Sequence, residues 1–191
     1  MYKLCKTEQS ANRQRALEQG LLEAMATQHF SDISVSDLCQ RMGVPRKSFY
    51  RYFDDKESAL CALLDHSLMK FQSYALSHSA VGHRSTHSEM ELFFQFWVLQ
   101  KPLLDALRRS ELTSLLISRA ILYTNSAVIP QQFLPECDKE IRTQLTMFVV
   151  CGLMSLVLQW HRDGYPQSVS QMADVGVRLV TQPLFPRLPQ K

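Results

Sequence analysis

Apolar positions along this chain recur with the period of amphipathic helices. In residues 12–27 they fall at the i, i+4, i+7 and i+8 spacing of one helix face, at Leu17, Leu21, Ala24 and Met25. The same periodicity predicts helices over residues 34–42, 46–53, 55–75, 89–100, 102–109, 111–125, 138–162 and 168–182. No segment alternates with the period of a strand, so the pattern predicts an all-α protein.

Local signals mark the ends of the short helices near the N-terminus. Ser34 is a predicted N-cap with Asp37 three residues later, and Gly43 can adopt the left-handed conformation that ends the helix. Pro45 fits the start of the next helix, which is too short to be stable without neighbours. Asp54 or Asp55 is expected to cap the long helix that follows. Residues 34–53 are therefore predicted to form a helix, a tight turn and a second helix.

Two polar or proline-containing breaks divide the rest of the chain. Residues 77–88 are small, polar and aperiodic, and residues 127–137 contain two prolines, so both segments are predicted loops. The first break follows the group of short helices. We therefore expect an N-terminal group of short helices, ending in the start of a long one, and a C-terminal helical part.

Composition narrows the class of protein. The 191 residues are 46% hydrophobic and 20% charged, which is enough to form a buried core. Five cysteines without a Cys-x-x-Cys pair argue against a disulfide framework and a structural zinc site. The N-terminus lacks an apolar leader, and the apolar run at residues 147–160 is predicted to be too short to cross a membrane. We expect a cytoplasmic protein without a membrane partner.

The distribution of charge is more informative than the net charge of +3. Between Leu38 and Phe53 the chain has four basic residues and no acidic one: Arg41, Arg46, Lys47 and Arg51. Such a stretch can be simply a solvated helix face. However, the predicted second helix also displays Ser48, Tyr50 and Tyr52 around one apolar residue, Phe49. Arg and Lys hydrogen-bond guanine edges and hydroxyls suit phosphates, so this helix-turn-helix pattern favours duplex DNA as a partner.

Residues 33–60 resemble the DNA-binding domain of TetR-family transcriptional regulators. The matching features are the Ser-Val start, the Gly-Val turn, the Phe-Tyr-x-Tyr-Phe recognition helix and the Lys-Glu-x-x-Leu opening of the next helix. Two residues depart from the family pattern: Pro45 stands where a Ser is usual, and His29 stands near a frequent Gly. The resemblance implies a helix-turn-helix DNA-binding domain over residues 11–71, followed by a helical effector-binding and dimerisation domain over residues 72–191.

The resemblance also assigns roles to single residues. It implies that Ser34, Ser48, Tyr50, Tyr52 and Lys56 contact the sugar-phosphate backbone, that Arg46 and Lys47 reach base edges, and that Arg51 belongs to the same surface. A phosphate at the helix start would bind Lys56 together with free backbone N–H groups. It further implies a ligand-responsive repressor that binds a palindromic double-stranded operator as a homodimer, paired through residues 138–162 and 168–182. A small apolar or amphipathic effector is expected to relieve DNA binding.

Candidates for the effector pocket are aromatic and methionine side chains of the C-terminal part: Phe93, Phe96, Trp97, Tyr123, Met147 and Met154. Each of them is more simply explained as an ordinary core residue, although such side chains also line helical effector sites. His78, His83 and His87 lack ligand partners at metal-binding spacing, and no catalytic motif is present, so no metal, cofactor or enzymatic activity is predicted. The alternatives are a DNA-binding module without an effector and a small all-helical enzyme.

Overall fold

The computed structural model describes residues 2–78, 85–126 and 139–182. Within this part of the chain it contains nine α-helices, one 3-10 helix and an isolated β-bridge between Tyr2 and Phe53. The predicted all-α fold is confirmed. The predicted break at residues 127–137 and half of the predicted loop at 77–88, residues 79–84, lie outside the described residues.

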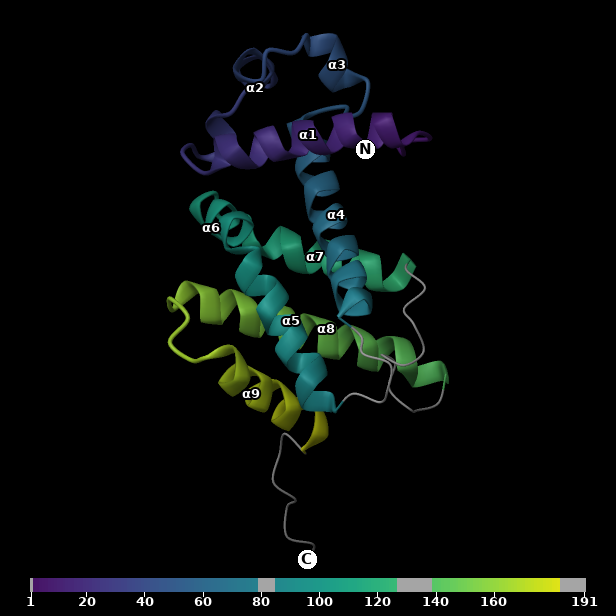
Figure 1. Ribbon diagram of the computed structural model, residues 1–191, viewed down its shortest axis with the longest axis vertical. Helices are drawn as coiled ribbons and strands as arrows, with labels where there is room; N and C mark the ends of the chain where they lie inside the picture. The colour runs from purple at the N-terminus through teal and green to yellow at the C-terminus, as the bar shows by residue number, and fades with distance from the viewer. Residues whose placement is uncertain (1, 79–84, 127–138, 183–191) are drawn as a thin grey trace, which may run out of the picture.

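The N-terminal elements form one end of the molecule (Figure 1). They are α1 (Glu8–Met25), the 3-10 helix η1 (Phe30–Asp32), α2 (Val35–Arg41), α3 (Arg46–Tyr50) and α4 (Lys56–Ser77). The first helix begins four residues before the predicted start, because Thr7 accepts a hydrogen bond from the Ser10 N–H at 3.2 Å and caps it. From this end α4 runs down the long axis into the C-terminal half (Figure 1).

The predicted caps of the short helices are present. The Ser34 hydroxyl accepts from the Asp37 N–H at 3.0 Å, and Gly43 has a φ of +63° where the turn leaves α2. Asp55, rather than Asp54, caps α4 by accepting from the Ser58 N–H at 2.6 Å. These local bonds fix the directions of α2, α3 and α4 relative to the turns between them.

The C-terminal helices pack below the N-terminal group (Figure 1). They are α5 (Thr86–Leu99), α6 (Lys101–Arg109), α7 (Thr113–Ser126), α8 (Lys139–Arg162) and α9 (Val169–Thr181). Helix α5 lies closely along α9, where a Cβ on Gly176 would come within 3.0 Å of the Met90 sulfur. Helix α7 packs against both α4 and α8, and α6 packs against α1. Helix α5 also packs against α4, so the C-terminal part contacts the N-terminal helices through α5, α6 and α7.

One hydrophobic core runs through both parts of the chain. Its largest fully buried side chains include Phe49 and Phe53 from the end of α3, Leu21 from α1, and Phe94 and Trp97 from α5. Burial of side chains of this size is the main stabilising contribution to the fold. The N-terminal helices are thus not an independent module on a linker but pack on the remainder.

Helix α8 differs from the other helices because much of its apolar surface is uncovered. Residues Ile141–Arg162 have a mean hydropathy of 1.7, and only 17% of this segment is buried. By length and composition alone it could cross a membrane, so the prediction that this apolar run is too short was wrong. The helix of a subunit interface has the same composition. Its exposed apolar residues are Ile141, Leu145 and Phe148.

Candidate nucleic-acid interface

Phe49 anchors α3 to the rest of the N-terminal helices. Its side chain is fully buried, and its ring lies 5.1 Å from that of Phe53 and 5.7 Å from that of Tyr50. The turn before α3 is closed by the Val44 N–H, which donates to the Cys39 carbonyl at 3.0 Å. A five-residue helix is not stable alone, so these contacts determine how α3 is presented.

The remaining side chains of α3 point away from the core. Arg46, Lys47, Tyr50 and Arg51 are exposed and Ser48 is half-buried. The Arg46 guanidinium lies 6.0 Å from the centre of the Tyr50 ring, and its hydrogen bond with Tyr50 raises the pKa of Arg46 above the ordinary value. Arg46 therefore stays charged, and the aromatic ring beside it limits the directions that it can take.

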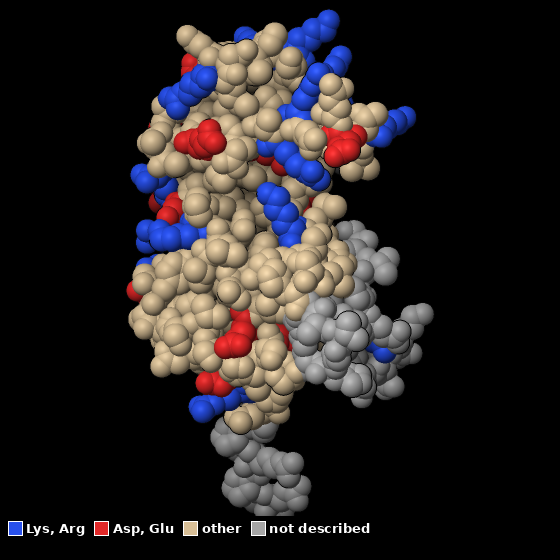
Figure 2. Space-filling model, viewed as in Figure 1, with Lys and Arg blue, Asp and Glu red and all other residues tan. Residues whose placement is uncertain are grey.

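Residues from separate elements meet at a shallow hollow beside α3. It has a volume of about 430 Å³ and is lined by Ser34, Arg46, Tyr50 and Lys56 among others. The structure thus brings together residues that the sequence places in α2, α3 and α4. Figure 2 shows Lys and Arg side chains projecting from this end of the molecule, whereas the visible face of the C-terminal half is largely uncharged. Such a basic end suits a polyanion.

Ser34 is exposed, but its hydroxyl has local partners. The oxygen caps α2 and also donates to an Asp37 carboxylate oxygen at 2.7 Å. A phosphate contact by Ser34 would therefore involve exchanging the Asp37 carboxylate for a phosphate oxygen.

Tyr52 departs from the sequence prediction. Only 5% of it is exposed, and its hydroxyl faces α1, where the Ser10 hydroxyl donates to it at 3.5 Å. Its ring packs 6.3 Å from that of Phe53. The structure places Tyr52 in the core between α1 and the end of α3, so it supports the interface from beneath.

Lys56 also departs from the prediction. Its ammonium donates three hydrogen bonds, to the carbonyl oxygens of Phe30 at 2.8 Å, Ser31 at 2.9 Å and Ile33 at 2.9 Å. It lies 4.8 Å from the centre of the Phe30 ring. All three N–H donors of Lys56 are thus used within the protein to hold η1 against the start of α4. Nothing in the local sequence pattern signals these partners, because they lie more than 20 residues away.

Comparison with known proteins agrees with this geometry. Residues 20–62 match the family of bacterial regulatory proteins described as the tetR family. The HTH-type transcriptional regulator EthR from Mycolicibacterium smegmatis is 36% identical over 83 residues, which are 41% of this chain and 37% of the length of EthR. The likeness to the tetR family is thus shown for residues 20–62, which include α2, α3 and the start of α4. The chain matches only a little over a third of the curated relative's length.

Two solved structures have the same overall fold as this chain. The dihydroxyacetone kinase operon activator DhaS has a TM-score of 0.57 and 15% identity, over 88% of this chain and 93% of that one. The fatty acid degradation regulator FadR from Bacillus halodurans has a TM-score of 0.57 and 13% identity, over 95% and 98%. At such identities the likeness shows the fold and nothing further.

The candidate effector residues lie in different settings. Phe93 and Phe96 join Phe71 and Tyr74 of α4 in an aromatic cluster with ring distances of 5.3 to 5.5 Å. Phe96, Trp97 and Met154 are almost fully buried, whereas Tyr123 and Met147 are half-buried. The Tyr123 hydroxyl donates to the Gln72 amide oxygen at 2.8 Å. The structure brings the three α5 residues together and distributes the others over α7 and α8.

Trp97 has a feature that the sequence could not reveal. It is 1% exposed, and its indole N–H has no hydrogen-bond partner among the described residues. A buried donor without an acceptor costs free energy, on the order of 1–3 kcal/mol. The N–H of Trp97 is therefore a donor that an acceptor atom from outside the chain can satisfy.

Metal binding has no structural basis in the part of the chain that is described. No group of three or more His, Cys, Asp or Glu side chains there is arranged to hold a metal ion. His87 instead lies near two carboxylates, Glu91 at 3.9 Å and Asp174 at 3.3 Å, in contacts on α5 and between α5 and α9. His83 lies outside the described residues.

Proposed function

We propose that this protein is a transcriptional regulator that binds a palindromic operator in double-stranded DNA as a homodimer. One observation carries the proposal: α3 buries Phe49 and exposes Arg46, Lys47 and Arg51 on the other side. A helix of this kind inserted into the major groove presents bidentate donors to base edges. Residues 11–71 act as the DNA-binding domain, and the DNA partner implies a cytoplasmic protein.

The exposed residues divide into two roles in this proposal. Arg46 and Lys47, in the first turn of α3, read base edges, because their donors match the acceptors of guanine. Ser34, Ser48, Tyr50 and Arg51 contact the sugar-phosphate backbone and fix the register. Tyr52 and Lys56 hold the recognition helix and η1 in place instead of contacting DNA.

The homodimer forms through α8 and α9. Ile141 and Phe148 on α8 are 51% and 61% exposed, and Val175 and Leu179 on α9 are 38% and 39% exposed. Apolar side chains of this size at i, i+4 and i, i+7 positions normally have a partner, and a second copy of the same two helices supplies one. Pairing about a two-fold axis places two copies of α3 on one side of the duplex, as a palindrome requires.

The C-terminal part, residues 72–191, also binds a small apolar or amphipathic effector. Support comes from the aromatic cluster around Phe93 and Phe96 and from the indole N–H of Trp97, which has no hydrogen-bond partner in the described part of the chain. A ligand with an apolar body and one hydrogen-bond acceptor matches this combination. Tyr123, Met147 and Met154 are the further pocket candidates. We propose no catalytic role.

Selective binding to genomic DNA tests the function. The purified chain is mixed with genomic fragments at moderate salt, and bound fragments are separated by gel shift and competed with scrambled duplex. The proposal expects a few fragments to be retained, and retention to be lost when Arg46 and Lys47 are both replaced by Ala. Equal retention of all fragments, or of none, would rule out a sequence-specific regulator.

A further inference from the structure

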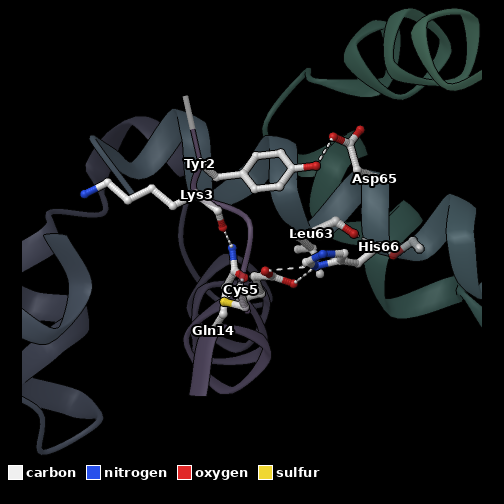
Figure 3. A network of polar contacts seen from close by, with 9 residues as sticks. Tyr2, Lys3, Cys5, Gln14, Leu63, Asp65 and His66 are labelled. Carbon is white, nitrogen blue, oxygen red and sulfur yellow. Dashed lines mark hydrogen bonds and ion pairs between the residues drawn. The ribbon is translucent and has the colours of Figure 1, made fainter. Parts of the chain in front are cut away.

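The segment before α1 packs against the recognition helix. We call residues 2–5 the N-terminal strap (Figure 3). The Lys3 N–H donates to the Tyr52 carbonyl at 2.9 Å, and Tyr2 forms the β-bridge with Phe53. On the other side the Gln14 amide of α1 donates to the Lys3 carbonyl at 3.3 Å. The strap therefore holds residues 52 and 53, which directly follow α3, through backbone contacts.

Tyr2 fastens the strap to α4. Its hydroxyl donates to the Asp65 carboxylate at 2.7 Å, as Figure 3 shows, and its ring packs edge-on at 6.0 Å from that of His66. His66 in turn lies 2.8 Å from the Glu18 carboxylate of α1. Burial, followed by the hydrogen bond with Asp65, raises the pKa of Tyr2 well above its ordinary value, so the hydroxyl remains a donor at neutral pH.

The same carboxylate is held from the opposite side by α7. Arg119 donates to Asp65 through Nε at 2.7 Å and through Nη2 in a second, parallel bond. Asp65 is only 8% exposed, so its charge depends on Arg119 as a counter-ion and on Tyr2 as a further donor. Asp65 is thus a shared anchor for the C-terminal helix α7 and for the strap that holds the end of α3.

We propose that the N-terminal strap positions the recognition helix and that the position of α7 controls the strap. The two are coupled through Asp65, which is hydrogen-bonded by both Tyr2 and Arg119. Tyr2 and Lys3 are adjacent, so a displacement of the Tyr2 hydroxyl acts directly on the bond between Lys3 and Tyr52. When Arg119 moves away, Asp65 loses its counter-ion and the end of α3 loses a fixed support. The effect on DNA binding rests on the proposed function, whereas the mechanical link does not.

Amide hydrogen exchange measured by NMR on the full chain, with any tag at the C-terminus, tests the link. Tyr2→Phe removes the strap's bond to Asp65, and Arg119→Met removes the bond from α7. Both are expected to speed exchange of the Lys3 and Phe53 amides about tenfold. The control is Ser118→Ala, which removes a hydrogen bond within α7, from the exposed Ser118 hydroxyl to the Ser114 carbonyl at 3.1 Å. It is expected to leave both amides as in the wild type.

Two further variants keep the test decisive. Arg119→Lys retains the positive charge and is expected to keep most of the protection of the two amides. Protection kept in Arg119→Lys but lost in Arg119→Met shows that the loss comes from the missing counter-ion of Asp65. In the double variant, Tyr2→Phe with Arg119→Met, exchange should be no faster than in the faster single variant, because both act through Asp65. Faster exchange in Tyr2→Phe but wild-type exchange in Arg119→Met would overturn the link to α7. Unchanged exchange in both would overturn the role of the strap.

The DNA readout is separate from the exchange readout. On a retained fragment, Tyr2→Phe and Arg119→Met are expected to weaken selective binding about three- to tenfold, and Ser118→Ala to leave it unchanged. If the wild-type chain selects no DNA, the proposed function fails while the exchange data still decide the coupling. If selective binding is normal in variants whose Lys3 amide is unprotected, the strap does not position the recognition helix.

Discussion

Lys56 is the residue where sequence and structure lead to the most different predictions. Its three bonds to η1 carbonyls predict that Lys56→Ala lowers the free energy of unfolding by about 1–3 kcal/mol, measured by urea denaturation. Because the ammonium is used internally, the slope of log K against log salt should stay as in the wild type. Arg51→Ala, which removes an exposed cation, should instead reduce that slope by about 0.9 for each subunit. If Lys56→Ala reduced the slope and left the free energy of unfolding unchanged, Lys56 would contact a DNA phosphate.

Arg46 and Lys47 are predicted to carry the discrimination between sequences. Replacing either by Ala should cost about 1–3 kcal/mol per half-site on the preferred operator and flatten the preference at one base pair. Lys70→Ala removes an equally exposed cation from α4 and serves as the control. Fluorescence anisotropy on operator and scrambled duplex over a salt series gives both quantities. If the Ala variants weaken both duplexes equally, these residues contact phosphate and not bases.

Phe49 and Tyr50 are neighbours with opposite environments, which makes them a matched pair. Phe49→Ala empties a fully buried position and should destabilise the protein by about 3–5 kcal/mol. Tyr50 is 42% exposed, so Tyr50→Ala should change the free energy of unfolding by no more than about 0.5 kcal/mol while weakening DNA binding. Urea denaturation monitored by circular dichroism compares them. Equal losses of stability would mean that α3 is not anchored through Phe49.

Local signals explain which residues could be predicted from the sequence. Ser34, Gly43 and Phe49 have the predicted placements because capping, a left-handed turn and helical periodicity each act within a few residues. Tyr52 and Lys56 could not be placed in the same way. Their partners lie 42 and 23 to 26 residues away in the sequence, so only the folded chain shows that these polar groups face inward.

The helices were predictable as elements, but their ends were less so. Thr7 extends α1 to Glu8 through a cap that the apolar pattern does not register, and Ser85 does the same for α5 by accepting from the Ser88 N–H at 3.2 Å. The contact between the strap and α3 was not predicted at all. Residues 2–5 have no helical periodicity, and their partners come from α1, α3 and α4.

Helix α8 carries a prediction about assembly. Phe148→Arg places a charge in the proposed dimer interface and should convert a dimer of twice 22.0 kDa into a monomer, measured by light scattering after gel filtration. The control is Gln95→Arg, an exposed position on α5. A wild-type chain that is monomeric at micromolar concentration would contradict the proposed interface and leave the exposed apolar face of α8 for another partner.

Polar links among the described residues join the C-terminal helices to the N-terminal end and to one another. The Phe30 N–H of η1 donates to the Ser110 hydroxyl after α6 at 3.0 Å. His161 of α8 lies 2.8 Å from Asp105 of α6, and Arg119 of α7 holds Asp65 of α4. Because a single core also spans both parts, a ligand that displaces α6, α7 or α8 is expected to alter the position of α3.

The proposed dimer adds a geometric requirement at this scale. Two recognition helices that enter successive major grooves on one side of the duplex must lie about 34–36 Å apart. A displacement of a few ångströms at the end of each α3 changes this distance and weakens binding to a fixed operator. In this account the dimer contacts of α8 and α9, the strap and a bound effector all act on DNA binding through the distance between the two recognition helices.

Selection of bound sequences from a random DNA pool tests the central claim most directly. The wild-type chain and the Arg46→Ala, Lys47→Ala double variant are each taken through several rounds at the same salt concentration. The account predicts that the wild type enriches a palindrome whose half-site centres are one helical turn, about 10 base pairs, apart. The double variant should enrich no common sequence. A wild-type chain that enriches nothing, or a double variant that enriches the same palindrome, would contradict the claim that α3 reads DNA.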